Sequence, residues 1–328
     1  MTKPNPYRPF RADPAQLALK PQVSGNDINS RGEATPHAPR VVYWASDPDL
    51  IPHGKMQRLF YAVDPHNQDL ARARAGRAPI LAQPLAPLLG EPVQRPPQAW
   101  TQALTAFAAG ADFESCGVAA MEPAWVYEGQ QVSQSRIVTL GVAHDYEAIA
   151  TAPAASAGAE VVRQYGRVAA AAKAVADWLR GQGWDAEPLT GPMTTKVILI
   201  PPAIACGFGE LGKHGSLNNP EHGSSFRLAA VLTDAPLAPT PPRSFGVDSF
   251  CLHCRVCEDA GPPEAIAPAK QLVRSVEKWY VDFDHCLPFF NQTHGCAVGI
   301  AACPRSRPGV GLSLAAKLAR RSARTDAL

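Results

Sequence analysis

The chain has 328 residues, a net charge of +2 and eight cysteines. This length is sufficient for a hydrophobic core without disulfides, and the nearly neutral charge does not indicate nucleic acid or acidic lipid as a partner. We find no apolar run of about 18 residues, no signal-peptide core and no twin-arginine pair, so we expect a cytoplasmic protein. In a reducing cytoplasm, the cysteines are expected to be metal ligands rather than disulfides.

The first part of the chain alternates between polar and structured segments. Residues 1–38 are polar and contain scattered proline and glycine, which predicts an extended or mobile lead-in. A short β-rich run follows at Arg40–Trp44. The proline-rich stretch 84–98 predicts an irregular connection. A helix is then expected at Trp100–Ala109 and a strand at Ser115–Met121.

A stronger strand candidate lies at Arg136–Val142, which is rich in β-branched residues. It leads directly into four polar or titratable residues, His144, Asp145, Tyr146 and Glu147. Ends of strands are places where α/β proteins often carry their chemistry. This segment is therefore a candidate for part of a site.

Apolar residues recur at helical spacing through 153–182, and Gly181 follows the last of them. We interpret this helix as a core element. Val197–Ile200 predicts a buried strand, and Arg227–Leu232 predicts another. The mixture of elements indicates an α/β (α+β) protein.

A glycine-rich stretch, Gly207–Gly215, lies between these two predicted strands. Its glycines permit positive φ angles and close approach of the backbone. It is not a Walker loop, because no lysine–serine or lysine–threonine pair follows in register. Alone, the stretch is consistent with either a binding loop or an ordinary connection.

Three cysteines at successive spacings of two residues, Cys251, Cys254 and Cys257, carry the strongest signal in the chain. This spacing lets three thiolates converge on three corners of a [4Fe–4S] cube, as in bacterial ferredoxins. Structural zinc sites more often pair two cysteines in one knuckle with two ligands in another. An iron–sulfur cluster is the favoured interpretation, and zinc is the alternative.

A second, incomplete run consists of Cys286, Cys296, Gly299 and Cys303, while Gly261 takes the fourth position of the first run. In two-cluster ferredoxins the fourth cysteine of each run binds the other cluster. The first cluster would therefore be bound by Cys251, Cys254, Cys257 and Cys303. Both glycines fall on the second cluster, which indicates a complete first cluster and a lost or altered second one.

The second position leaves several alternatives open. His285 and His294 lie next to Cys286 and Cys296 in the sequence, so a two-cysteine, two-histidine [2Fe–2S] site of the Rieske ligand type is conceivable. The site could instead be empty, with both thiols packed or free. Substrate or another cofactor could also use the space.

The glycine-rich stretch, the segments Pro220–Leu228 and Thr233–Leu237, and the paired cysteine runs resemble the corrinoid iron–sulfur reductases. These are the reductive dehalogenases and, more distantly, the epoxyqueuosine reductases. The resemblance is specific over 190–305 and looser over 100–190. It implies an α/β domain that binds cobalamin, a bacterial ferredoxin-like domain, and cobalt-based cleavage of a carbon–halogen or related bond.

With this resemblance we expect four segments. They are an N-terminal lead-in at 1–38, an α/β cofactor- and substrate-binding domain at 39–240, a ferredoxin-like iron–sulfur domain at 241–310, and a basic C-terminal helix or tail at 311–328. The implied partners are a small-molecule substrate and an electron donor such as a ferredoxin, a flavodoxin or a reductase. No nucleic acid and no membrane are expected.

The resemblance also implies residues for catalysis and cofactor binding. The proton donor in such dehalogenases is a tyrosine helped by a basic residue, which here suggests Tyr146 with Lys196 or Arg180, and Tyr127 as the second choice. The corrinoid-cradling positions would be Gly207, Gly209, Gly212, Lys213, His214 and Gly215.

Two departures from the family pattern keep other functions open. Epoxyqueuosine reductases use an aspartate shortly before the glycine-rich stretch, and residues 191–196 contain no carboxylate, which counts against that reaction. The incomplete second run suggests as an alternative a single-cluster electron-transfer or sensor protein without corrinoid. A haem or other tetrapyrrole is a third possibility, with His144, His214 or His222 as axial ligand.

Overall fold

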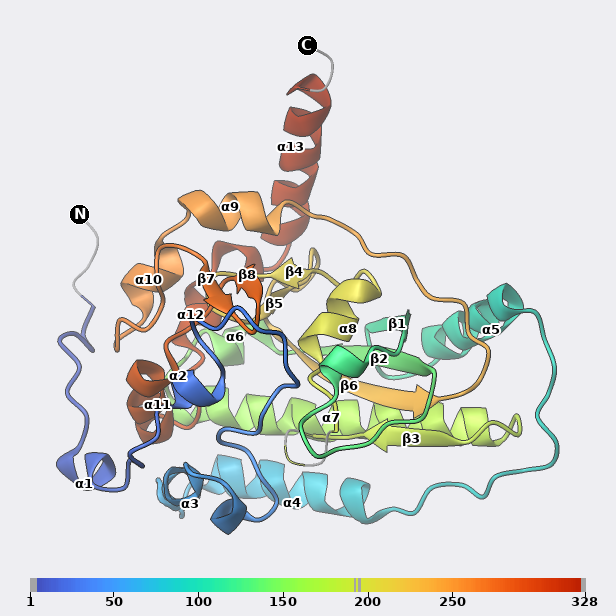
Figure 1. Ribbon diagram of the computed structural model, residues 1–328, viewed down its shortest axis with the longest axis horizontal. Coiled ribbons are helices and arrows are strands. Elements are labelled where there is room, and N and C mark those ends of the chain that lie inside the picture. Colours follow the sequence, from blue (N-terminus) through green and yellow to red (C-terminus); the bar gives the residue numbers. More distant parts are fainter. Residues whose placement is uncertain (1–4, 192, 194–195, 326–328) are drawn as a thin grey trace.

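The computed structural model describes residues 5–191, 193 and 196–325. Its centre is an antiparallel sheet in the order β1–β2–β6–β3 (Figure 1). The strands are β1 (Ser115–Ala120), β2 (Arg136–Ala143), β3 (Ala186–Leu189) and β6 (Phe226–Thr233). The predicted α/β (α+β) class is confirmed, and three of the expected strands form this sheet.

Both faces of the sheet are buried because the strands carry apolar side chains on both sides. Val138, Leu140 and Val142 face one core and Ile137 faces the other, all fully buried. The first core is completed by α5 (Pro97–Ala109) and the long helix α7 (Ala155–Arg180). The second is completed by the short helix α8 (Ile200–Ala205) and the loop after it. α4 (Gln68–Ala82) lies outside, along α7 (Figure 1).

Two predicted strands are wrong. Val197 makes only an isolated bridge to Val126, and the chain turns into α8 at Ile200. Pro201 and Pro202 occupy the first turn of that helix, where a missing N–H costs nothing and the fixed φ favours the helix. Arg40–Trp44 forms no strand and extends along a cavity.

The C-terminal third is built from short elements (Figure 1). They are α9 (Val247–His253), α10 (Val256–Ala260), β7 (Gln271–Val273), β8 (Val276–Lys278), α11 (Phe283–Gln292), α12 (Val298–Ala302), η3 (Pro304–Ser306) and α13 (Val310–Thr325). The small hairpin of β4 (Glu210–Leu211) and β5 (Leu217–Asn218) connects this third to the sheet. Among the described helices, none is long and apolar enough to cross a membrane.

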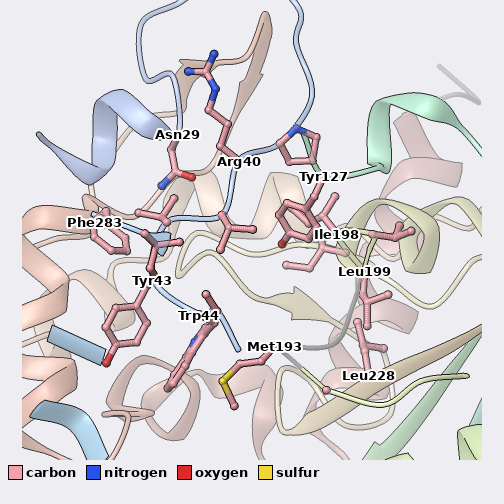
Figure 2. A pocket seen from close by; sticks show the side chains of 18 of the residues that line it. Asn29, Arg40, Tyr43, Trp44, Tyr127, Met193, Ile198, Leu199, Leu228 and Phe283 are labelled. Atoms are coloured by element: carbon pink, nitrogen blue, oxygen red, sulfur yellow. The ribbon is translucent and has the colours of Figure 1, made fainter. Parts of the chain in front are cut away.

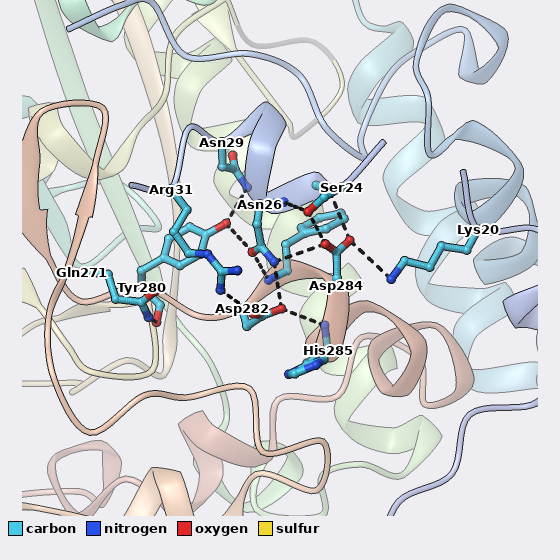
Figure 3. Close-up of polar contacts among 12 residues, drawn as sticks. Lys20, Ser24, Asn26, Asn29, Arg31, Gln271, Tyr280, Asp282, Asp284 and His285 are labelled. Atoms are coloured by element: carbon cyan, nitrogen blue, oxygen red, sulfur yellow. Dashed lines mark hydrogen bonds and ion pairs between the residues drawn. The ribbon is translucent and has the colours of Figure 1, made fainter. Parts of the chain in front are cut away.

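The N-terminal segment is packed against the C-terminal third, although its polar composition predicted a mobile lead-in (Figure 3). The buried Asn26 donates a 3.0 Å hydrogen bond to Asp282 and accepts bonds from Tyr280 and from the backbone of Phe283. Asn26, a polar residue of this segment, is therefore a buried hydrogen-bond partner of the C-terminal third.

The remaining short elements are α1 (Pro14–Leu17), α2 (Gly25–Ile28), η1 (Pro48–Leu50), α3 (Gly54–Ala62), η2 (Pro123–Trp125) and α6 (Tyr146–Ile149).

The two expected terminal segments are only partly described. Residues 1–4 of the lead-in and 326–328 of the basic tail lie outside the described residues, as do residues 192, 194 and 195 of the stretch before α8. The basic tail forms the helix α13, which projects away from the body of the molecule (Figure 1).

Candidate functional site

Four cysteines from three short elements meet in the C-terminal third. Cys251 lies in α9, Cys254 directly follows it, Cys257 lies in α10 and Cys303 directly follows α12. Cys251, Cys257 and Cys303 are at most 7% exposed. Burial, and to a smaller extent the charge on the other thiols of this four-cysteine group, raises the pKa of Cys251 to about 11 and that of Cys257 to about 12.

Hydrogen-bond donors and cations surround the four-cysteine group. The backbone N–H of Lys213 lowers the pKa of the buried Cys251, and the backbone N–H groups of Arg305 and Ser306 do the same for Cys303. The Lys213 ammonium is itself 2% exposed, pairs with Glu258 and lies 5.0 Å from the Trp279 ring centroid. Donors of this kind stabilise thiolates and tune the potential of a cluster.

The Arg305 guanidinium supplies a test of fit for an anionic cluster. It is fully buried and donates to the Phe245 carbonyl at 3.3 Å, and its Nε and Nη1 have no hydrogen-bond partner among the residues that the structure describes. Burial lowers its pKa, whereas charge on Cys303 and Cys251 raises it. Unpaired buried donors are costly, and thiolates with inorganic sulfides would accept their bonds. The four-cysteine group therefore fits a [4Fe–4S] cluster.

Two further findings concern a zinc ion and a second metal site at Cys286 and Cys296, the alternatives named above. In the described part of the chain, no three His, Cys, Asp or Glu side chains form a group that could hold a single metal ion. Cys286 lines the larger of two cavities and Cys296 lines the smaller one. Burial raises the pKa of Cys286 to about 12 and that of Cys296 to about 11.

The Ile266 side chain lies close to both absent ligands of the second run. A Cβ atom placed on Gly261 would lie 3.9 Å from Ile266 Cδ1, and one placed on Gly299 would lie 3.8 Å from the same methyl group. Both distances are ordinary van der Waals contacts, so an apolar methyl group borders the two positions.

A cavity of about 820 Å³ lies between the N-terminal segment, the loop before α8 and the C-terminal third (Figure 2). Its lining includes Tyr43, Trp44, Tyr127, Met193, Leu199, Ser216, Phe226, Arg227, Arg274, Phe283, Cys286 and Ile300. A second cavity of about 370 Å³ shares Trp44, Tyr165, Met193, Arg227 and Phe290 with it. Together they form a largely aromatic and aliphatic space with a few polar groups, which is typical of a cofactor or substrate site.

Tyr127 is the predicted proton donor that lines the large cavity. Its backbone N–H donates a 2.9 Å bond to the Lys196 carbonyl, which fixes the residue after η2. Burial raises the pKa of Tyr127, and the charge of Arg274, which lines the same cavity, lowers it. Arg274 was not among the predicted residues, because it lies in the tight β7–β8 turn with a φ of 51° and no motif marks it.

The other predicted catalytic residues lie elsewhere. In the described part of the chain, Tyr146, Lys196 and Arg180 line neither cavity. The Tyr146 hydroxyl donates to the Ala301 carbonyl at 3.4 Å, the Lys196 ammonium lies 2.7 Å from Glu187, and Arg180 pairs with Asp185. Each therefore already has a structural partner. The expectation that Tyr146 is the first choice is not supported by its position.

The glycine-rich stretch builds the β4–β5 hairpin rather than the cavity wall. A Cβ atom on Gly209 would lie 2.0 Å from the Asn218 carbonyl oxygen, and one on Gly212 would lie 2.3 Å from its amide nitrogen. Gly207 and Gly215 have φ angles of 82° and 77°. Of the described stretch, no residue lines either cavity, whereas Ser216 and Leu217 immediately after it do.

Of the predicted histidine ligands, His144 is buried and His214 and His222 are half-buried, and all three lie outside the cavity linings that the structure describes. Burial lowers the pKa of His214 to about 4, and its ring contacts Ser216, Asn218 and Ser224. Burial, together with the charge of Arg227, lowers the pKa of His144 to about 2. His222 lies beside Glu221 at 3.8 Å. Their positions do not favour axial ligation of a haem in either cavity.

The architecture built around these cavities is the fold of the reductive dehalogenases. The catabolic reductive dehalogenase NpRdhA, in complex with 3-bromo-4-hydroxybenzoic acid, superposes with a TM-score of 0.67 and 23% identity over 88% of this chain and 45% of that one. The resemblance predicted from the sequence is thereby confirmed for the fold. No family model matches the chain.

Sequence comparison gives relatives of the same kind. The chain is 34% identical over 208 residues to the tetrachloroethene reductive dehalogenase of Desulfitobacterium hafniense, covering 59% of this chain and 37% of that protein. It is 34% identical over 116 residues to the epoxyqueuosine reductase of Synechococcus sp. (strain CC9605), covering 34% of this chain and 31% of that protein. The chain spans less than half the length of these relatives.

Proposed function

We propose that the chain is a corrinoid-dependent iron–sulfur oxidoreductase that removes a halogen from a small organic molecule. The observation that carries the proposal is the buried four-cysteine group beside a large apolar cavity, in the fold of the reductive dehalogenases. The cavity approaches this group through Ile300 of α12, the helix that ends at Cys303. We further propose that residues 39–240 form the cofactor- and substrate-binding domain and that residues 241–310 form the iron–sulfur domain.

The cluster ligands would be Cys251, Cys254, Cys257 and Cys303, with Arg305 donating to the anionic cluster. A corrinoid in the cavities would supply a cobalt centre that accepts electrons from the cluster and cleaves the carbon–halogen bond. Reductive dehalogenation consumes two electrons and one proton, and it releases the reduced carbon compound and a halide ion. The electrons would come from a protein donor such as a ferredoxin, a flavodoxin or a reductase.

Tyr127 would provide the proton. Its burial keeps the hydroxyl protonated at neutral pH, and the nearby charge of Arg274 would stabilise the phenolate left after transfer. Phe283, Phe290 and the aliphatic lining would exclude water around the reacting carbon. Because one structural relative binds 3-bromo-4-hydroxybenzoic acid, halogenated aromatic acids are the first substrates to test.

The proposal is tested by metal content. The protein should be produced in a host supplied with cobalamin, purified without oxygen, and analysed for iron, cobalt and zinc per chain. We expect about four irons and about one cobalt, followed by turnover of a halogenated aromatic acid with a chemical reductant. Cysteine-to-serine replacement of Cys254 should remove the iron, and replacement of the distant Cys116 should not.

Other results would point to the alternatives. Iron without cobalt would support a single-cluster electron-transfer protein. Zinc in place of iron would contradict the cluster assignment. About eight irons would show that the second site holds a cluster despite Gly261 and Gly299.

A further inference from the structure

The second cavity carries an unusual set of charges. Three arginines line it, Arg74 and Arg77 from α4 and Arg227 from β6, and no aspartate or glutamate belongs to its described lining. Among the described residues, none of the three forms an ion pair. Asp64, whose charge acts on His294 of the same lining, accepts a 3.0 Å hydrogen bond from Asn67.

Aromatic rings hold these guanidinium groups in place. The Tyr165 ring lies between two of them, with its centroid 5.6 Å from Arg77 Cζ and 4.8 Å from Arg227 Cζ. Arg74 lies over the Tyr61 ring at 5.5 Å. Stacking on a ring orients a guanidinium but leaves the N–H donors at its edge available.

Several of those donors are buried without a partner. Arg77 Nε and Arg227 Nε are shielded from solvent and make no hydrogen bond in the described part of the chain. Arg77 Nη2 reaches the Thr190 carbonyl only at 3.4 Å, and Arg227 Nη1 reaches the Tyr165 hydroxyl only at 3.5 Å. Gathering three cations without a counter-ion is unfavourable for the protein alone. The arrangement therefore indicates a ligand that supplies the negative charge.

We propose that Arg74, Arg77 and Arg227 form a subsite for the oxyanion of an organic ligand, a carboxylate or a phosphate ester, whose flat apolar part packs on the aromatic lining. Arginine forks bind both oxyanions through paired N–H bonds. Trp44, Phe60 and Phe290 supply the apolar wall. Since the cavity is continuous in its lining with the large one, the ligand is either an anionic substrate or the phosphate-bearing tail of a cofactor.

The main test replaces two of the arginines with a neutral side chain of similar length. In the Arg74→Gln/Arg77→Gln variant, calorimetry should show the Kd of benzoate and of phenyl phosphate rising by about tenfold or more, because charge-assisted bonds are lost. The Kd of benzamide, which has the same shape as benzoate without the charge, should change by less than about twofold. The matched control is Arg72→Gln on the same helix, which removes an exposed arginine paired with Asp69.

Thermal unfolding separates a binding role from a structural one. Without added oxyanion, the double variant should melt no lower than Arg72→Gln, because it relieves repulsion between unpaired cations. Phenyl phosphate should raise the melting temperature of the wild type and not that of the double variant. A lower melting temperature, with equal losses for benzoate and benzamide, would overturn the subsite.

The two sources of the oxyanion are distinguished with corrinoids. If the phosphate of a cofactor tail occupies the subsite, the double variant loses affinity for cobalamin but not for cobinamide, which lacks that phosphate. If a substrate carboxylate occupies it, both corrinoids bind the variant as they bind the wild type, and only benzoate and phenyl phosphate are affected. The subsite does not rest on the proposed function. If the chain binds no cobalt but prefers benzoate over benzamide through these arginines, the subsite is supported and the proposed function is contradicted.

Discussion

At the scale of single residues, the surroundings of two tyrosines separate the roles they could have. Tyr127 is half-buried in the cavity wall, within range of the Arg274 charge, whereas the Tyr146 hydroxyl is bonded to the Ala301 carbonyl. A general acid must reach the carbon it protonates. Of the two tyrosines, Tyr127 is the one that lines a cavity, which is why we propose it as the proton donor.

We therefore expect Tyr127→Phe to bind iron and cobalt as the wild type does and to lose about 10²-fold or more in kcat on a halogenated aromatic acid. Tyr146→Phe serves as the matched control and should keep turnover within about threefold. Steady-state release of halide under anaerobic conditions measures both. Unchanged turnover in Tyr127→Phe would exclude it as the proton donor.

The residues of the site differ in how far the sequence can predict them. Cysteine spacing predicted four thiols that the structure brings together, because a cluster-binding loop is a local geometry written in a short motif. The sequence favours Tyr146 over Tyr127, whereas the cavity lining favours Tyr127. That lining includes Arg274 and part of the N-terminal segment, which are distant from Tyr127 in the sequence, so the motif around either tyrosine does not predict it.

At the scale of elements, the loop after α10 and the helix α12 explain how a cluster site can be lost without loss of fold. Gly261 and Gly299 are the two absent ligands, and the Ile266 methyl group lies near both. Gly261 has a φ of −67°, so its backbone suits any L-residue. The backbone at this position can therefore carry a cysteine without strain.

Restoring the thiols should therefore restore metal binding. We expect Gly261→Cys/Gly299→Cys/Ile266→Ala, reconstituted with iron and sulfide, to rise from about four to about eight irons per chain, with Cys286 and Cys296 completing the second set. Ile266→Ala alone should stay at about four, since it adds space without ligands. Iron analysis and electron paramagnetic resonance report the change, and an unaltered iron content in the triple variant would contradict this account of the second site.

The sequence predicts well those helices and strands in which apolar residues recur at a regular spacing. It does not predict the segments whose conformation depends on residues that contact them in space. The repeat of apolar residues at helical spacing predicts α7, the β-branched run Arg136–Val142 predicts β2, and the apolar run Arg227–Leu232 predicts β6. Val197–Ile200 has the composition of a strand, yet Pro201 and Pro202 favour the start of the helix α8 at Ile200. Arg40–Trp44 is apolar because it lines a cavity, which composition alone does not distinguish from a strand.

At the scale of the whole molecule, the N-terminal segment joins the two ends of the chain. Asn26 is 3% exposed and bonds Asp282, Asp284, Tyr280 and the backbone of Phe283 (Figure 3). Arg8 binds the Gly261 carbonyl at 3.1 Å. The polar sequence of this segment suggested mobility, because its partners lie far away in the sequence.

Removing that junction should destabilise the protein. Asn26→Ala removes one donor from each of the half-buried Asp282 and Asp284 carboxylates, and it removes the acceptor of the Tyr280 hydroxyl and of the Phe283 N–H. We therefore expect a loss of about 2–4 kcal/mol in the free energy of unfolding. Asn5→Ala, at the more exposed end of the same segment, should cost less than about 1 kcal/mol. Urea unfolding followed by circular dichroism compares the two. Equal and small losses would show that the segment contributes little.

The same junction determines when the fold can be completed during synthesis. Asn26 and Tyr280 are separated by 254 residues. A ribosome adds residues at roughly 5–20 per second, so the first partner leaves the exit site roughly 10–50 s before the second exists. Through that interval the polar early segment remains hydrated, and its low hydrophobicity then keeps the nascent chain from aggregating. The polar composition of the N-terminal segment thus serves both states: it supplies hydrogen bonds in the folded protein and keeps the segment hydrated in the nascent chain.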